Sequence, residues 1–260
     1  MLVFPQFVTA ASALYPVVKR QRMRSVVNVL GDGTRDVFAD NDGALVEWDL
    51  YAKGLTAAEW NSVESLYEQV SGSWQTFTFL DPTDNLLADS ELLSSAAWTT
   101  GALVQLTPGV ADPLGTTRAT TVTNGGQNTG GVQQTLAVPG SFQYCLSAWV
   151  RSSAGSSVTL TAGASTSVVP ATAVWNRVVL AAGAGSSAAT NVAFGVELPA
   201  GGSADLFGLQ VEAQLAASDY KMTGGGGVYS QARFAADPLV FTAQGTDVYD
   251  ALIRIVSPQN

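Results

Sequence analysis

The chain contains no histidine and a single cysteine, Cys145, among its 260 residues. The absence of imidazole excludes Ser-His-Asp and Cys-His catalysis, and it removes histidine ligands for zinc or iron. One thiol allows neither an intrachain disulfide nor a cysteine metal cluster. Only carboxylate chemistry of the kind that glycosidases use stays open, and no motif points to it. We therefore expect a protein that is not an enzyme and that uses no cofactor or metal.

Charge and long apolar runs are also scarce. Charged residues make up 13% of the chain, and the net charge is −9. An acidic chain is a poor partner for nucleic acid, and no apolar run approaches the roughly 20 residues of a membrane span. The first ten residues, MLVFPQFVTA, lack the basic start and long apolar stretch of a secretion signal. We expect no specific nucleic-acid binding, no membrane span, and folding in the cytoplasm.

The first part of the chain predicts strands and turns. Ser25–Leu30 and Thr34–Phe38 flank Gly31-Asp32-Gly33, a pattern typical of a β-hairpin. Asp40–Gly43 predicts a second turn. Its composition resembles a calcium loop, but the distal glutamate of such a loop is missing. Residues 44–51 alternate between apolar and mixed side chains, which predicts a half-buried strand.

One helix is expected. Thr56 and Glu59 form a capping box, in which each side chain can bond the other residue's backbone amide. Apolar residues then follow at helical spacing, namely Trp60, Val63, Leu66, Tyr67 and Val70. Gly72 closes the helix over residues 56–71, and Trp74–Leu80 predicts a further strand.

From Asp84 onward Ser, Thr, Gly and Ala dominate, and short strands recur between turns. Eight strands are predicted, at 103–107, 117–123, 131–137, 142–150, 157–162, 174–181, 190–198 and 203–212. Such spacing without helices indicates an antiparallel β-sandwich or jelly roll.

Composition changes back near the end of the chain. Thr223–Gly227 predicts a flexible joint, and three aromatic-rich strands follow it. We therefore expect a discontinuous β-rich assembly domain, 1–83 plus 221–260, interrupted by an inserted sandwich at 84–220. One continuous, mainly β protein is the alternative.

Short motifs within 84–220 resemble the carbohydrate-binding jelly rolls that recur in phage tail and tail-fibre proteins. The matching pieces are Asn85-Leu86-Leu87, Ser90-Glu91, Ala97-Trp98, Leu146–Val150, Trp175–Val178, Gly208–Glu212 and Ala217–Tyr220. The resemblance implies a glycan-binding module, with host-surface polysaccharide as a partner.

The flanking segments resemble the distal tail proteins of long-tailed phages and gene-transfer particles. The matching pieces are Phe4-Pro5, Arg22–Asn28, Leu30–Gly33, Trp48, Gly54–Thr56, Glu59 and Gly72–Pro82. The resemblance implies a hexameric homo-oligomeric ring in the virion tail that contacts tube, hub or fibre proteins. It transfers no catalytic residue.

Strand 142–150 supplies the candidate site. Its predicted core face holds Phe142, Tyr144, Leu146, Ala148 and Val150. The other face holds Gln143, Trp149 and Arg151, and a tryptophan beside polar groups can stack a sugar ring. If the polar face of strand 131–137 belongs to the same sheet, Gln133 joins them. The candidate carbohydrate-binding residues are therefore Trp149, Arg151, Gln143 and Gln133.

Several alternatives stay open. A loop or a neighbouring subunit could cover Trp149, and Trp98 and Trp175 are expected in the core or at its edge. The basic run Lys19–Arg24 fits an exposed edge strand, a contact with acidic partner subunits, or the lining of a DNA channel. The whole chain could also be a secreted glycan-binding or glycan-degrading protein, or a tail subunit whose insert is a structural spacer.

Overall fold

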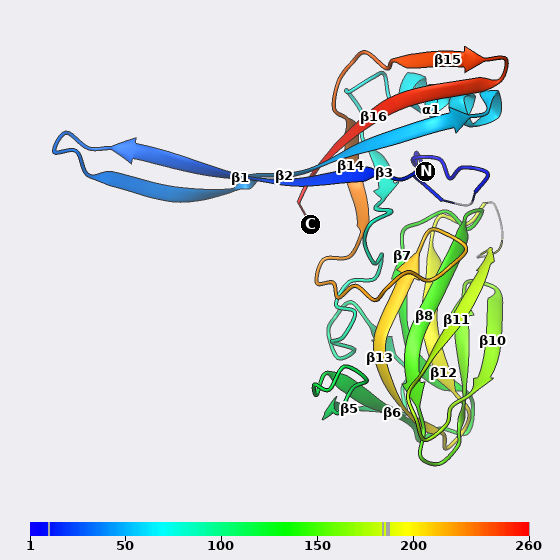
Figure 1. Ribbon diagram of the computed structural model, residues 1–260. Helices are drawn as coiled ribbons and strands as arrows, with labels where there is room; N and C mark the ends of the chain where they lie inside the picture. Colours follow the sequence, from blue (N-terminus) through cyan, green and yellow to red (C-terminus); the bar gives the residue numbers. More distant parts are fainter. Residues whose placement is uncertain (10, 184, 186–187, 260) are drawn as a thin grey trace. The chain divides into compact units, whose positions relative to one another are not determined.

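The computed structural model describes residues 1–9, 11–183, 185 and 188–259, without the side chains of residues 41 and 42. This part of the chain is mainly β, with strands β1–β16 and the helix α1 (Figure 1). The chain forms two compact units. Unit 1 comprises Met1–Phe7, Ala13–Phe79 and Tyr229–Asn260, and unit 2 comprises Val8–Ser12 and Leu80–Val228. None of the helices in the described residues has the length and apolarity that crossing a membrane requires.

Unit 1 is built on one sheet with the strand order β1-β2-β16-β14-β3, and β15 pairs with β16. The strands are β1 (Val17–Val29), β2 (Arg35–Leu55), β3 (Phe77–Leu80), β14 (Val228–Phe234), β15 (Phe241–Gly245) and β16 (Val248–Pro258). Trp48 is fully buried in its core, where its ring lies 4.9 Å from that of Phe79 and 4.7 Å from that of Tyr229.

The predicted helix is confirmed as α1 (Ala57–Gln69), with Thr56 at its N-cap. The Glu59 amide donates to the Thr56 hydroxyl over 3.3 Å, and the Thr56 amide donates to the Glu59 carboxylate over 2.9 Å. These two bonds satisfy backbone donors that the first turn leaves free. Trp60, Val63 and Leu66 are buried against the sheet.

The predicted hairpin is confirmed, and its strands are longer than expected. β2 runs through this segment and pairs with β1 on both sides of it, Arg24 with Asp40 and Arg22 with Leu45, so the predicted turn at Asp40–Gly43 is wrong. The register shifts between Arg22 and Arg24 instead, and a β-bulge of this kind lets a strand continue through a polar segment. Gly43 is required there, because a Cβ atom would lie 2.7 Å from Cδ of Arg24. Two of the side chains that give residues 40–43 a calcium-like composition, those of residues 41 and 42, lie outside the described residues.

The basic run lies on β1, at the edge of the sheet. Its arginines make cross-strand ion pairs with β2, namely Arg20–Asp49 at 2.7 Å, Arg22–Glu47 at 2.9 Å and Arg24–Asp40 at 3.1 Å. Residues 20–29 of β1 are exposed. The run therefore forms an exposed edge strand, which was one of the predicted alternatives.

Unit 2 is a jelly-roll sandwich of two antiparallel sheets, β10-β9-β12-β7-β4 and β11-β8-β13-β6-β5. The strands are β4 (Thr99–Thr100), β5 (Val104–Val110), β6 (Ala119–Asn124), β7 (Gly130–Leu136), β8 (Gln143–Arg151), β9 (Ser157–Ala162), β10 (Ser165–Pro170), β11 (Asn176–Gly183), β12 (Val192–Leu198) and β13 (Ser203–Glu212). All eight predicted strands are confirmed, and the sequence missed only β4 and β10. Both lie at sheet edges, where few apolar side chains mark a strand.

The core of unit 2 lies between these sheets. Tyr144 from β8 and Phe194 from β12 meet there with ring centroids 5.2 Å apart. Trp98 is buried, as expected, and its indole donates to the Asp89 carbonyl over 3.0 Å.

The predicted flexible joint at Thr223–Gly227 is wrong. The Asp81 amide donates to the Gly227 carbonyl, and the Asp89 amide donates to the Gly224 carbonyl, each over 2.9 Å. A Cβ atom on Gly226 would lie 2.7 Å from the Leu86 carbonyl oxygen. Glycine is needed here for close packing of two backbones rather than for a hinge.

Candidate binding sites

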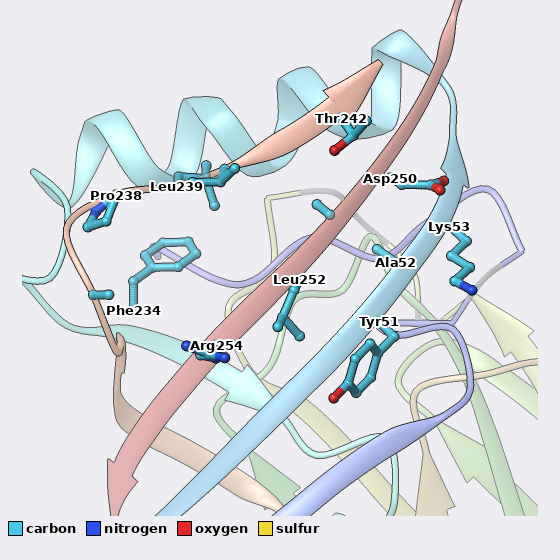
Figure 2. Close-up of a pocket in the computed structure, with 13 residues that line it drawn as sticks. Tyr51, Ala52, Lys53, Phe234, Pro238, Leu239, Thr242, Asp250, Leu252 and Arg254 are labelled. Carbon is cyan, nitrogen blue, oxygen red and sulfur yellow. The ribbon is translucent and has the colours of Figure 1, made fainter. Parts of the chain in front are cut away.

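Unit 1 contains a hollow of about 500 Å³ over β2 and β16 (Figure 2). Its apolar lining includes Phe234, Leu239 and Leu252, and Lys53 and Arg254 add positive charge. The lining carboxylate, Asp250, already accepts from the Gly54 amide at 2.8 Å and from the Gln244 amide group at 3.0 Å. The one carboxylate in the lining is therefore already engaged in hydrogen bonds.

In unit 2, β8 has the two faces that the sequence predicted. Tyr144, Leu146, Ala148 and Val150 are buried in the core. Cys145, Ser147, Trp149 and Arg151 alternate with them on the outer face. Cys145 and Ser147 are nevertheless fully buried, and burial raises the pKa of the Cys145 thiol to about 11. Part of this outer face is therefore covered.

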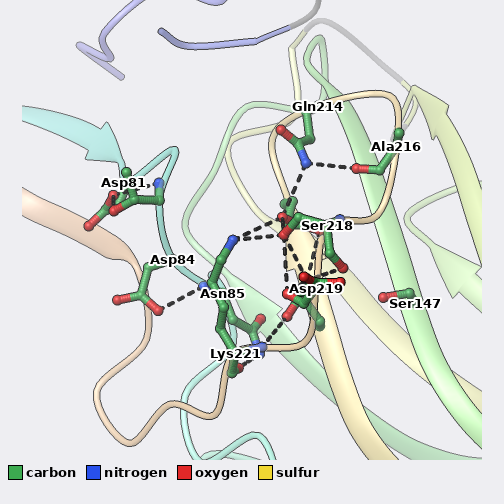
Figure 3. Close-up of polar contacts among 12 residues, drawn as sticks. Asp81, Asp84, Asn85, Ser147, Gln214, Ala216, Ser218, Asp219 and Lys221 are labelled. Atoms are coloured by element: carbon green, nitrogen blue, oxygen red, sulfur yellow. Dashed lines mark hydrogen bonds and ion pairs between the residues drawn. The ribbon is translucent and has the colours of Figure 1, made fainter. Parts of the chain in front are cut away.

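The cover is a polar cluster around Glu212 (Figure 3). The Glu212 carboxylate accepts from the Ser218 hydroxyl at 2.5 Å, from the Gln210 amide group at 2.8 Å and from the Ser218 backbone amide at 2.9 Å. The Lys221 ammonium lies 3.3 Å away. The buried Gly208–Glu212 motif and the more exposed Ala217–Tyr220 motif thus form one hydrogen-bond network.

Asn85 joins the start of the module to the same network (Figure 3). It is fully buried, and its side-chain amide donates to the Leu209 carbonyl over 2.9 Å. Its side-chain oxygen accepts from the amides of Leu87 at 3.1 Å and Val211 at 2.9 Å. The two end motifs of the sandwich are therefore in direct contact.

Trp149 lies on the outer face between Arg177 of β11 and Phe207 of β13. Its side chain is half-buried. β13 has an irregular register after Phe207, where Gly208 adopts a positive φ of 61°. A Cβ atom there would lie 3.2 Å from the Tyr220 ring and 3.4 Å from Cδ1 of Trp149. Gly208 thus lets Tyr220 approach the tryptophan, and part of the indole stays accessible.

Arg151 is engaged within the module. Its guanidinium donates to one Asp205 oxygen from Nε at 2.9 Å and from Nη2 at 2.7 Å. It also stacks 4.6 Å from the ring centre of Trp175. Thr121 holds the other Asp205 oxygen at 2.6 Å. Arg151 is therefore fixed in an ion pair and offers little to a ligand.

The two glutamines do not join Trp149. Gln143 lies six residues away on β8, which is roughly 20 Å along a strand. Gln133 lies on β7, in the other sheet, where it lines a small hollow of about 170 Å³ with Thr99 and Glu197. The predicted groove, in which β7 shares a sheet with β8, is not formed.

Two buried donors near Trp149 have no hydrogen-bond partner within the described part of the chain. They are Nε1 of Trp175 and Nε of Arg177. An unpaired buried donor costs about 1–3 kcal/mol, so each of these groups calls for an acceptor that the described residues do not supply. No pattern in the sequence, which places Trp175 in the core or at its edge, indicates this arrangement.

A further hollow of about 440 Å³ in unit 2 was not predicted. It is lined by the 89–94 segment, by β5 and β6, and by residues 222–224. The charged pair Glu91–Arg118, at 2.9 Å, lies in its wall. Glu91 belongs to a motif quoted above, but only the fold shows that Arg118 meets it.

No protein-family model matches the chain, and no curated protein matches its sequence. Several solved structures are similar in fold. The enzymatically active domain of bacteriophage CBA120 tailspike protein 4 is 13% identical with a TM-score of 0.41, covering 52% of this chain and 22% of that one. The CBM22-1 xylan-binding domain from Paenibacillus barcinonensis Xyn10C is 13% identical with a TM-score of 0.39, covering 52% of this chain and 94% of that one. A putative sugar binding protein from Bacteroides thetaiotaomicron VPI-5482 is 11% identical with a TM-score of 0.41, covering 49% of this chain and 99% of that one.

Proposed function

We propose that the chain is a non-catalytic structural subunit of a phage-like tail tip. In this proposal unit 1 assembles into a homo-oligomeric ring with other tail proteins, and unit 2 binds polysaccharide on the host surface. The observation that carries the proposal is the outer half of the β1–β2 hairpin, which extends beyond the rest of unit 1 (Figure 1).

This outer half carries apolar side chains on both of its faces. Val26 pairs with Phe38, and the next pair along, Val27 with Val37, points to the opposite face. These four side chains are 40–63% exposed. A two-stranded ribbon is marginally stable alone, and exposed apolar groups of this kind mark a contact surface. Neighbouring copies of the chain would bury both faces in a closed ring.

The assembly role can be tested by replacing both apolar residues of one hairpin strand. The double variant Val37→Thr/Phe38→Thr keeps β-forming residues and removes apolar area, so self-association should weaken by at least tenfold. Val168→Thr is the matched control, because Val168 is also an exposed valine on a strand but lies on β10 of unit 2. Sedimentation across a concentration series measures the effect. A double variant that associates like the control would contradict the assembly role.

Glycan binding by unit 2 is supported by the half-buried Trp149 on the face away from the core. An indole can stack on the apolar face of a sugar, and the neighbouring Arg177 supplies donors. Single contacts of this kind are weak, with millimolar affinity expected, and several copies in a ring would strengthen attachment.

Trp149→Ala should weaken binding to host-cell polysaccharide by at least tenfold while destabilising unit 2 by only about 1–2 kcal/mol, because the side chain is half-buried. The matched control is Trp74→Ala, a change to an exposed tryptophan in unit 1. A glycan array and a thermal melt supply the two measurements. Binding that is unchanged in Trp149→Ala would remove this residue from the site. A wild-type chain that binds no glycan would favour the spacer alternative.

A further inference from the structure

The hollow beside Arg118 in unit 2 has an apolar wall with an open rim. Its volume is about 440 Å³, within the range of small-molecule sites. The apolar lining residues are Leu92, Leu93, Leu106, Pro108 and Met222. Leu92 and Met222 are 54% and 64% exposed, so the rim presents apolar surface to solvent. A ligand with a small apolar group could bury it here.

One side of the hollow holds a fixed hydrogen-bond donor. Nη1 of Arg118 lies 3.0 and 2.9 Å from the two Glu91 oxygens, and the Tyr220 hydroxyl donates to Glu91 over 3.0 Å. The guanidinium also lies 5.5 Å from the ring centre of Phe207. Its Nη2 group makes no hydrogen bond with the described residues. Arg118 is therefore preorganised, with donor capacity left over.

A free acceptor also lines the hollow. Asp89 adopts a left-handed φ of 46°, a conformation that few residues other than glycine tolerate. Its backbone is held on both sides, by the Gly224 carbonyl and by the Trp98 indole. Within the described ranges, no hydrogen bond or ion pair engages its carboxylate. An unpaired carboxylate on a backbone held at both ends is available to a ligand.

We propose that this hollow binds an N-acetylated, uncharged hexosamine unit of a glycan. The acetamido methyl group would contact the apolar wall, its carbonyl would accept from Nη2 of Arg118, and its N–H or a ring hydroxyl would donate to Asp89. The inference rests on the proposed glycan-binding function of unit 2 and adds to it a second subsite, separate from Trp149, with a named sugar class. An acidic sugar is disfavoured, because the two lining carboxylates outnumber the one guanidinium.

The test uses the full chain and three soluble sugars, N-acetylglucosamine, glucose and glucosamine. Saturation-transfer NMR and calorimetry should show N-acetylglucosamine binding at least tenfold more tightly than glucose, with the strongest transfer to the acetamido methyl group. Equal binding of glucose, or tighter binding of the cationic glucosamine, would overturn the proposal.

Asp89→Asn tests the site within the protein, since asparagine also tolerates the left-handed conformation. It should weaken N-acetylglucosamine binding by about tenfold, and Leu92→Ser should weaken it further at the rim. Asp219→Asn, at an exposed aspartate of the same unit, should change nothing. Binding that is lost in Trp149→Ala but unchanged in Asp89→Asn would overturn this hollow as the site and leave the glycan function standing. A chain that binds no member of a broad glycan array would overturn both.

Discussion

The two units differ in how far they cover their own side chains. Unit 2 surrounds Asn85 and Glu212 with partners and covers part of the outer face of β8, and the buried donors Nε1 of Trp175 and Nε of Arg177, beside Trp149, have no partner among its described residues. Unit 1 leaves the outer half of its hairpin uncovered, with Phe38 and Val37 exposed on opposite faces. An uncovered apolar ribbon gains stability from a partner that buries it, whereas unpaired donors beside a half-buried indole can take a small polar ligand. The roles proposed above, assembly for unit 1 and recognition for unit 2, require this difference.

The largest single effect is expected in the core of unit 1. Trp60 is 3% exposed, and its ring lies 4.7 Å from that of Phe241. Trp60→Ala removes a large buried side chain and should lower the free energy of unfolding by about 3–5 kcal/mol. Chemical denaturation followed by circular dichroism measures the loss. Trp74→Ala in the same unit, at an exposed position, should cost less than about 0.5 kcal/mol. A cost below about 1 kcal/mol at Trp60 would mean that α1 contributes little to unit 1.

A smaller loss is expected from the polar network of unit 2. Asn85→Ala leaves the amides of Leu87 and Val211 and the Leu209 carbonyl without their bonds to this side chain. Unpaired buried groups of this kind should cost about 2–4 kcal/mol in total. The exposed Asn191 of the same unit provides the control Asn191→Ala. Should Asn85→Ala melt like the control, unit 2 would not depend on this network, and the contrast between the units would weaken.

Much of the fold follows from periodic patterns in the sequence. The capping box at Thr56 and Glu59 has a local physical cause, so α1 could be predicted to within a few residues. The alternation along β8 likewise identified its core face, because successive side chains point to opposite sides. The wrong predictions concern segments whose conformation depends on contacts with a distant part of the chain. Residues 40–43 continue a strand because β1 pairs on both sides of them, at Asp40 and at Leu45, and the glycines at 224–227 pack against 81–90.

The site could be predicted less well, for the same reason. Alternation places Trp149 away from the core but does not reveal what lies over it, and Tyr220 comes from a segment more than seventy residues away. Sheet membership is also nonlocal, and it separates Gln133 from Trp149. Arg151 is likewise occupied by an ion pair with Asp205, which lies on another strand. No single-sequence pattern records such pairings, which explains why the Arg118 hollow was missed as well.

A pH-dependent effect is expected from Asp112 in unit 2. Burial alone would raise the pKa of its carboxyl, but hydrogen bonds from the Thr116 hydroxyl and from the amides of Arg118, Thr116 and Leu114 outweigh burial and lower it to about 2. In the unfolded chain an aspartate has a pKa of about 3.9. The lowered value stabilises the fold above that pH, and the contribution is lost as pH falls toward 2.

Melting temperatures measured between pH 5 and pH 2 should therefore fall less steeply in Asp112→Asn than in the wild type. Asp36→Asn, at an exposed position on the hairpin, should leave unchanged the slope of the melting temperature of unit 2 against pH. Parallel slopes for the wild type and Asp112→Asn would show that this carboxylate does not control the acid stability of unit 2.

The smallest effect on the stability of unit 1 is expected from deletion of the segment 82–226. The Asp81 amide lies 2.9 Å from the Gly227 carbonyl oxygen, so the two ends of the 82–226 segment are adjacent in space. Joining Asp81 directly to Gly227 should therefore close the chain of unit 1 without stretching it, and loop ends that already meet tolerate such changes. The core of unit 1, with Trp48, Phe79 and Trp60, does not include residues of the deleted segment. Its cooperative thermal transition should stay within a few degrees of the corresponding transition in the full chain. Adding Trp60→Ala to the deleted chain should then lower that transition as it does in the full chain, because the two changes are independent. A soluble deletion product without cooperative unfolding would show that unit 1 depends on the insert, and the discontinuous-domain prediction would be wrong.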